Sequence, residues 1–157
     1  MIEPQMGITD LNERIPFLLS QLGFYVAEEF GRRLEPFGVG PRTYAVLMAL
    51  NADDGQSQRQ LSARLRLHRN VMVTLVDDLE RQGLVKRMPH PGDRRAFAVT
   101  LTDKARDLLP ELDAQGRALQ DEITASLTAA ERRTALRLLQ RMSAEAGLIP
   151  GVHPKLG

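Results

Sequence analysis

Two adjacent arginines, Arg94 and Arg95, follow two prolines and a glycine in the stretch PHPGDRRAFAVTLT, residues 89–102. Guanidinium groups bind phosphate oxygens and base edges, so neighbouring arginines on a turn are suited to contact nucleic acid. Pro and Gly bend and stiffen such a turn, which would place both arginines at its tip. We expect Asp93, directly before them, to hold one guanidinium by a charge-assisted hydrogen bond.

The basic residues are concentrated in the middle of the chain. The 157 residues carry a net charge of +1, yet the segment 57–102 has nine Lys or Arg and four acidic residues, a local charge of +5. The rest of the chain has a charge of −4. This distribution favours a module that binds a polyanion. Ordinary solvated charge on helix surfaces is the alternative that charge alone leaves open.

Residues that could support catalysis or bind a metal form no recognisable constellation. Cysteine is absent, which excludes disulfides, thiolate metal sites and thiol nucleophiles. His68, His90 and His153 have no His, Asp or Glu partner at the spacing of metal ligands. No serine has a nucleophile-elbow context, and the GVG at 38–40 lacks the strand and third glycine of a phosphate-binding loop. We therefore expect no enzymatic activity, no metal and no cofactor.

Helical patterns account for most of the chain and must position the basic segment. A helix is expected over 16–37, where two glycines end it, and a shorter one over 41–51. In SQRQ, Ser57 precedes Gln60 by three residues, which matches a capping box and predicts a two-turn helix over 57–65.

The next helix, HRNVMVTLVDDLERQG, has two faces of different character. Apolar residues at i, i+3, i+4 and i+7 predict its buried face: Met72, Leu75, Val76 and Leu79. The opposite face has mostly short polar side chains: Arg69, Asn70, Val73, Thr74 and Asp77. Two short helices joined by about three residues, the second basic and polar on its exposed face, predict a DNA-binding helix-turn-helix. A purely structural helical hairpin has the same spacing and remains an alternative.

Two alternating segments, LVKRM and RAFAVTL, then predict the strands of a β-hairpin. A helix-turn-helix followed by a hairpin is a winged helix. In this arrangement the second helix enters the major groove, and the hairpin tip reaches the neighbouring minor groove or its phosphates. The predicted fold class is mainly α with a small β-hairpin wing, a winged helix-turn-helix flanked by N- and C-terminal dimerisation helices.

The C-terminal third predicts helices too long for a compact winged helix to cover. Thr102 should cap a helix to about Ser126, roughly 37 Å long and kinked by Pro110. TAAE at 128–131 is a second capping box that opens a last helix. Its apolar residues are Leu136, Leu139 and Met142. Pairing with a second copy through a two-fold interface would bury these helices, and an intramolecular three-helix cap is the alternative.

The stretch LVDDLERQGLVKRMPHPGDRRAFAVTLTDKARDLL resembles the signature region of the MarR family of bacterial transcriptional regulators, whose wing reads Asp-x-Arg before a hydrophobic strand and Leu-Thr. That pattern falls on Asp93, Arg95, Leu101 and Thr102. The resemblance, close over 57–110, implies a homodimer that binds a palindromic operator and usually represses, with small-molecule release in many members. It also implies that Arg95 is the minor-groove arginine. Branches that sense oxidants through cysteine are excluded, and branches that need a tryptophan do not fit.

These patterns give the candidate sites. The residues expected to contact DNA are Ser57, Arg66, His68, Arg69, Asn70, Val73, Thr74, Lys86, Arg94 and Arg95, and Asp93 should stabilise the wing. A ligand pocket with one cation, suited to an aromatic acid, would be formed by Phe17, Gln21, Arg42 and Tyr44. Core packing explains Phe17 and Tyr44 equally well. Asp77 and Asp78 would repel phosphate, so only the first half of the recognition helix is expected to insert.

The chain is expected to form one regulator domain over 1–157. Helical dimerisation regions at 10–38 and 102–147 would flank a winged helix-turn-helix at 39–101. No apolar run approaches the roughly 18 residues of a membrane span, and MIEPQMGITD lacks a secretion-signal pattern, so we expect a cytoplasmic protein without a membrane partner.

The predicted function is transcriptional regulation, as a repressor, by a homodimer on a pseudo-palindromic double-stranded DNA operator. A small aromatic or phenolic effector is the expected releasing ligand. The alternative is a winged-helix protein that serves protein–protein assembly or non-specific DNA compaction.

Overall fold

The computed structural model describes residues 7–154 and is mainly helical. The helices are α1 (Thr9–Asn12), α2 (Ile15–Leu34), α3 (Pro41–Ala52), α4 (Gln58–Leu65), α5 (Arg69–Arg81), α6 (Asp103–Ile123) and α7 (Ala129–Glu145), with a 3-10 helix at Glu35–Phe37. The strands β1 (Gln56–Ser57), β2 (Val85–His90) and β3 (Asp93–Leu101) form an antiparallel sheet in the order β1-β3-β2. Within 7–154, no helix combines the length and apolar character that a membrane span requires.

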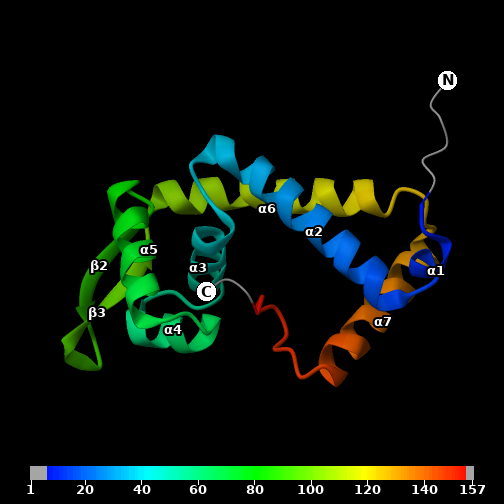
Figure 1. The fold of residues 1–157 in the computed structure, drawn as a ribbon. Helices are drawn as coiled ribbons and strands as arrows, with labels where there is room; N and C mark the ends of the chain where they lie inside the picture. The colour runs from blue at the N-terminus through cyan, green and yellow to red at the C-terminus, as the bar shows by residue number, and fades with distance from the viewer. Residues whose placement is uncertain (1–6, 155–157) are drawn as a thin grey trace.

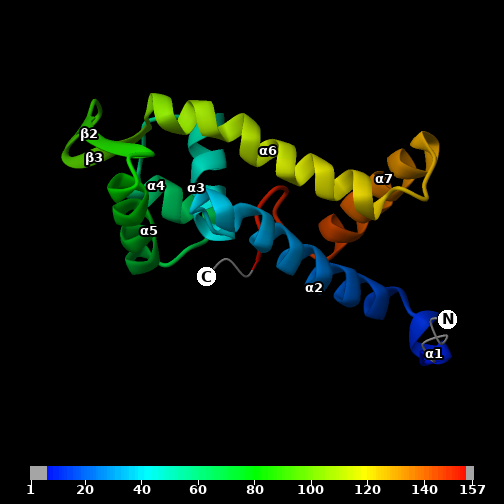
Figure 2. The same cartoon turned by 90° about the horizontal axis from the view of Figure 1, so that it is seen from above.

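The molecule is elongated, with α3, α4, α5 and the sheet at one end and α1 and α7 at the other (Figure 1). The long helices α2 and α6 both connect the two ends, as the view from above also shows (Figure 2). The fold is a winged helix-turn-helix carried on long helices, which confirms the predicted fold class.

The hydrophobic core lies at the winged-helix end. Its fully buried side chains come from α3, α4, α5 and the strands, joined by Leu34 of α2 and Leu112 of α6. On α5, Met72, Val76 and Leu79 are buried, which confirms the predicted inner face of this helix. Burial of these side chains fixes the rotation of α5 about its axis and thereby decides which residues it exposes.

The opposite end of the molecule has no comparable core. α7 has no buried residue, and an ion pair between Arg132 and Asp121, with an N–O distance of 3.1 Å, ties it to α6. On α2, Leu22 and Phe24 are 53% and 68% exposed. Within 7–154, α2 contacts α6, but α7 buries none of its residues, so these three helices do not form a packed intramolecular cap.

The capping signals in the sequence form as predicted. The Ser57 hydroxyl oxygen accepts a hydrogen bond from the Gln60 N–H at 3.2 Å, and the Gln60 side-chain oxygen accepts one from the Ser57 N–H at 2.8 Å. Thr128 begins α7 through the same reciprocal arrangement. Thr102 caps α6, which ends at Ile123 and continues through Pro110 without interruption (Figure 1).

The wing differs from its sequence prediction in two respects. Arg94 and Arg95 are the second and third residues of β3, and the turn itself consists of Pro91 and Gly92. The strand β1, which was not predicted, pairs Gln56 with Val99. Two residues are too few to show a hydrophobic period, so only the assembled sheet reveals this strand.

The turn between α4 and α5 contains a strained residue. Arg66 ends α4 with φ 53° and ψ 38°, and it is the one non-glycine residue with positive φ within 7–154. The left-handed conformation crowds a Cβ atom against the backbone, so glycine is the residue usually found there. Leu67 follows as a core residue, and His68 then begins α5.

Replacing Arg66 by Gly should stabilise the protein, because relief of left-handed strain exceeds the added chain entropy of glycine by about 0.5–1 kcal/mol. Thermal unfolding should then show a midpoint raised by about 1–4 °C. Arg66→Ala is the control, since it removes the same side chain but keeps the Cβ atom, and it should give no increase. Equal unfolding midpoints for the two variants would contradict the interpretation that the left-handed conformation of Arg66 is strained.

Candidate nucleic-acid interface

The amino-terminal end of α5 is organised by His68. The ring nitrogen Nδ1 of His68 accepts a hydrogen bond from the Asn70 N–H at 3.2 Å, so this histidine is the N-cap of the helix. A helix N-terminus presents free N–H groups and a positive dipole end, which favours phosphate binding. The sequence predicts His68 at the DNA surface but not its capping role, because histidine is not among the preferred N-cap residues.

The exposed face of α5 is chemically mixed. Arg69, Asn70, Val73 and Thr74 are all exposed, as the helical period predicted. The Thr74 hydroxyl donates to the Asn70 carbonyl oxygen at 3.1 Å, which orients the threonine side chain on the helix surface. Amide groups, short hydroxyl side chains and an apolar valine are the groups that contact base edges and thymine methyl groups in a major groove.

The carboxylates in the second half of α5 are paired within the protein. Asp78 accepts from Arg81 at 3.0 Å and from Gln82 at 2.9 Å. Asp77 and Glu80 both pair with Arg87 of β2. Because local cations neutralise these acids, they do not present unpaired negative charge to a phosphate backbone.

The same ion pairs reduce the number of cations in 57–102 that are available to contact DNA. Of the nine cations in 57–102, Arg81 and Arg87 are engaged in ion pairs. The other seven take part in no ion pair within the described chain: Arg59, Arg64, Arg66, Arg69, Lys86, Arg94 and Arg95. Most of these side chains are exposed on α4, on the turn, at the start of α5 or on the wing, so they can exchange counterions for phosphates.

The wing turn is held by side-chain contacts to its own backbone. The Asp93 Oδ1 atom accepts from the Arg95 N–H at 2.9 Å, and His90 Nδ1 accepts from the Gly92 N–H at 3.1 Å. The expected bond between Asp93 and an arginine guanidinium is not formed; the carboxylate supports the turn instead. Both arginine side chains are exposed.

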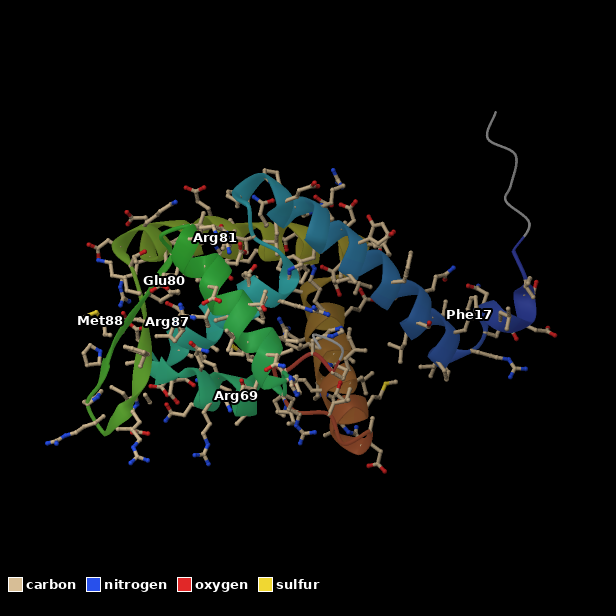
Figure 3. All side chains as sticks on the ribbon, turned by 60° about the vertical axis from the view of Figure 1, so that its left-hand side comes forward. Phe17, Arg69, Glu80, Arg81, Arg87 and Met88 are labelled. Carbon is tan, nitrogen blue, oxygen red and sulfur yellow. The ribbon has the colours of Figure 1, made fainter. Side chains whose placement is uncertain are left out.

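The remaining predicted DNA contacts lie at the same end of the molecule. Ser57 is half-buried and caps α4, Arg66 is exposed in the turn, and Lys86 is exposed on β2. Figure 3 shows Arg69 at the end of α5 that lies on the same side as the wing turn, whereas Arg81 lies at the opposite end of that helix. The structure thus gathers the predicted DNA-binding residues of α4, α5 and the wing at one end of the molecule.

The four predicted ligand residues are not brought together within one chain. Arg42 and Tyr44 line a cavity of about 1230 Å³ between α2, α3, α4, α5 and the C-terminal segment 150–153, but Phe17 and Gln21 are absent from its lining. Phe17 lies near the far end of α2 (Figure 3), roughly 20 Å along the helix axis from Phe30, which does line the cavity. The sequence cannot show where along α2 the neighbouring helix crosses, so it does not separate residues beside this cavity from those farther along the helix.

The cavity is apolar with a few polar groups. Phe30 and Tyr44 make an edge-to-face contact with ring centroids 5.0 Å apart. Burial, with a smaller effect of the nearby Asp113 charge, raises the pKa of the Tyr44 phenol above its ordinary value, so the hydroxyl stays protonated at neutral pH. Arg64 also lines the cavity, although it was not among the predicted ligand residues. It donates to the Ala49 carbonyl oxygen at 3.3 Å.

No cluster of three or more His, Cys, Asp or Glu residues suited to a metal ion occurs among residues 7–154. The polar groups of the winged-helix surface are instead distributed over exposed faces. Such an arrangement suits binding of an extended polyanion rather than a reaction at one point.

Comparison with known proteins relates this geometry to regulators of transcription. A sequence model of the MarR family matches residues 37–96. An HTH-type transcriptional repressor from Mycobacterium tuberculosis is 27% identical over 140 residues, which cover 89% of this chain and 100% of the repressor.

Two solved structures are similar over nearly their whole length. The transcriptional repressor CouR bound to a 23-mer DNA duplex aligns with a TM-score of 0.76 and 28% identity, over 89% of this chain and 99% of that chain. CouR from Rhodococcus jostii RHA1 bound to p-coumaroyl-CoA aligns with a TM-score of 0.70 and 30% identity, over 89% and 96% of the two chains.

Proposed function

The chain belongs to the MarR family of transcriptional regulators, which are not enzymes, and from this premise we propose that it is a cytoplasmic repressor that binds a pseudo-palindromic operator as a homodimer. The observation that carries the proposal is the separation of charges on the winged helix. Every carboxylate of α5 is paired internally, while within 7–154 the cations of α4 and the turn, and those of the wing other than Arg87, take part in no ion pair. This leaves the surface that would face DNA positive.

In the proposed complex the first half of α5 lies in the major groove. Base edges there are contacted by Asn70, Val73 and Thr74. Phosphates are contacted by Arg66 and Arg69. The wing places Arg95 at the adjacent minor groove, where a narrow groove attracts a guanidinium group, and Arg94 and Lys86 contact the backbone. Related CouR has been solved with a DNA duplex, which supports this mode of binding.

The uncovered apolar surface of the long helices supports the proposed dimerisation. Leu136, Leu139 and Met142 on α7 are 59%, 46% and 39% exposed. We assign 10–38 and 102–147 to the dimer interface and 39–101 to DNA binding. A two-fold pairing would bury the same apolar surface on both copies and set the two recognition helices about 34–36 Å apart, one turn of DNA.

The cavity is the proposed site of an effector that releases DNA. Its walls combine α2, a dimerisation helix, with Leu65 of α4 and Leu75 of α5 from the winged helix. A ligand held between them would change the orientation of α5 relative to the partner copy and so alter operator affinity. The apolar lining, the protonated Tyr44 hydroxyl and the cations Arg42 and Arg64 fit a molecule with an aromatic body and an anionic group.

Selection of random duplex DNA by the purified protein at about 150 mM salt should recover a palindrome with half-sites one helical turn apart. Arg95→Ala should then weaken binding to that DNA about tenfold or more, because an arginine–base contact contributes roughly 1–3 kcal/mol. Arg81→Ala is the matched control, since this arginine is paired with Asp78 at the far end of α5 and should change affinity less than about twofold. No consensus, together with binding that vanishes steeply as salt rises, would favour the compaction or assembly function instead.

Leu136→Glu should convert the dimer to a folded monomer, because a carboxylate in the apolar interface would be buried without a partner. Sedimentation analysis should show half the mass, and operator affinity should fall roughly 100-fold or more as the two half-sites lose their linkage. The control is Arg137→Glu, which by helical period lies away from the apolar stripe of α7. A dimer that persists with Leu136→Glu would rule out α7 as the interface.

Addition of p-coumarate or p-coumaroyl-CoA should weaken operator binding, measured by fluorescence anisotropy, if the cavity accepts aromatic anions. Calorimetry should show that Arg42→Ala weakens ligand binding about tenfold, because a hydrogen bond to a charged group is lost. Arg32→Ala should leave ligand binding unchanged, since Arg32 is outside the cavity and paired with Glu29 at 2.8 Å. Unchanged operator affinity with both compounds would contradict an effector of this class.

A further inference from the structure

Arg87 of β2 differs from the other cations of the basic segment because each of its three guanidinium nitrogens donates a hydrogen bond within the protein. Its Nε atom donates to Gln58 Oε1 at 3.0 Å, Nη1 to Glu80 Oε2 at 2.5 Å and Nη2 to Asp77 Oδ1 at 2.5 Å. The side chain is 18% exposed. We call Arg87, Gln58, Asp77 and Glu80 the Arg87 cluster.

The Arg87 cluster joins three elements of the winged helix: β2 in the wing, α4 and the recognition helix α5. Glu80 contributes a second contact, since its Oε1 atom accepts from the Arg87 backbone N–H at 3.2 Å. β2 is an edge strand, paired with β3 on one side only. The Glu80 side chain therefore occupies a donor on the free edge of the wing and attaches that edge to α5 (Figure 3).

Beyond Arg87, little packing holds the wing. Across the sheet Arg87 pairs with Val99, which is fully buried. One step nearer the turn, Ala98 is still buried and pairs with Ser57 of β1, but its neighbour Met88 on β2 is 48% exposed. Phe97, opposite Pro89, is 58% exposed. The cluster is thus the last side-chain anchor on β2 before the outer half of the hairpin, the half that carries Arg95.

We infer that Arg87 is a positioning residue that fixes the wing relative to α5, so that Arg95 reaches DNA only while the Arg87 cluster is intact. Arg87 is unsuited to a phosphate contact, because each of its three guanidinium nitrogens already donates within the protein and two carboxylates offset its charge. This inference rests on the proposed operator binding. It assigns a role to a residue that charge counting alone would place among the phosphate contacts.

The inference is tested by the cost of Arg95→Ala in three backgrounds: the natural sequence, Arg87→Gln, and the pair Asp77→Asn with Glu80→Gln. The operator recovered by selection is the probe, and circular dichroism checks that each variant is folded. In the natural sequence the cost should be about tenfold. In both altered backgrounds it should fall below about threefold, because a wing that is no longer anchored delivers Arg95 poorly.

The Asp77→Asn and Glu80→Gln pair makes this test selective. It removes two negative charges near the DNA and leaves Arg87 in place, so a purely electrostatic role would leave the full tenfold cost of Arg95→Ala intact. An undiminished cost in both altered backgrounds would overturn the inference.

A second measurement tests the role of Arg87 in the absence of DNA, so its outcome does not depend on operator binding. Hydrogen exchange of the free protein should show faster exchange of the amides in 88–97 in Arg87→Gln than in Lys86→Gln, the control on the neighbouring exposed residue of the same strand. If selection recovers no operator, the proposed function fails, and this comparison alone then decides the role of Arg87. Equal exchange in the two variants would overturn it.

Discussion

Burial of one leucine-rich core at the winged-helix end is the constraint on which the rest of the structure depends. Leu34 at the end of α2 and Leu112 in α6 join the same core as Met72 and Val76 of α5. The long helices and the recognition helix are therefore fixed to each other through shared apolar contacts. The exposed face of α5 follows from this, since the core decides which side of the helix is turned inward.

Ion pairs determine the charge of the α5 surface that the core leaves exposed. The core leaves Asp77, Asp78 and Glu80 on the outward part of α5, where their charge would oppose DNA. Arg81 and Arg87 neutralise them, and the cations nearer the turn and the wing stay unpaired. Since these pairs are partly exposed, their contribution to the free energy of folding is small. They set the sign of the charge that the surface presents, and the contacts of Arg87 also attach the wing to α5.

The cavity lies where the two halves of the molecule meet. α2 and α3 form one part of its wall, and Arg64, Leu65 and Leu75 of the helix-turn-helix form another. A ligand there would contact both the proposed dimerisation helices and the recognition helix without touching DNA. Energetic coupling between an effector and an operator needs such an element, one whose position both ligands influence.

Local patterns in the sequence were sufficient for the elements of the winged helix. The capping boxes at Ser57 and Thr128 and the apolar period of α5 act over three to seven residues, so neighbouring residues alone determine them. The alternation in β2 and β3 likewise predicted the hairpin. The candidate DNA-contact residues followed from these elements, because a helix period that assigns one face to the core assigns the other to solvent.

Contacts between residues distant in the sequence were decided only by the tertiary structure. Arg87 pairs with Asp77 ten positions away and with Gln58 twenty-nine positions away, and no local pattern distinguishes it from the unpaired Lys86 beside it. Phe17 and Tyr44 looked equally suited to one pocket, yet only Tyr44 lines the cavity, because the crossing point of α2 and α3 depends on packing. The sequence by itself determined the longer helices, the two hairpin strands and the buried face of α5, but not the two-residue strand β1. The packing of those elements determined which charges remain free and where the cavity lies, because both depend on distances between elements that local periodicity does not encode.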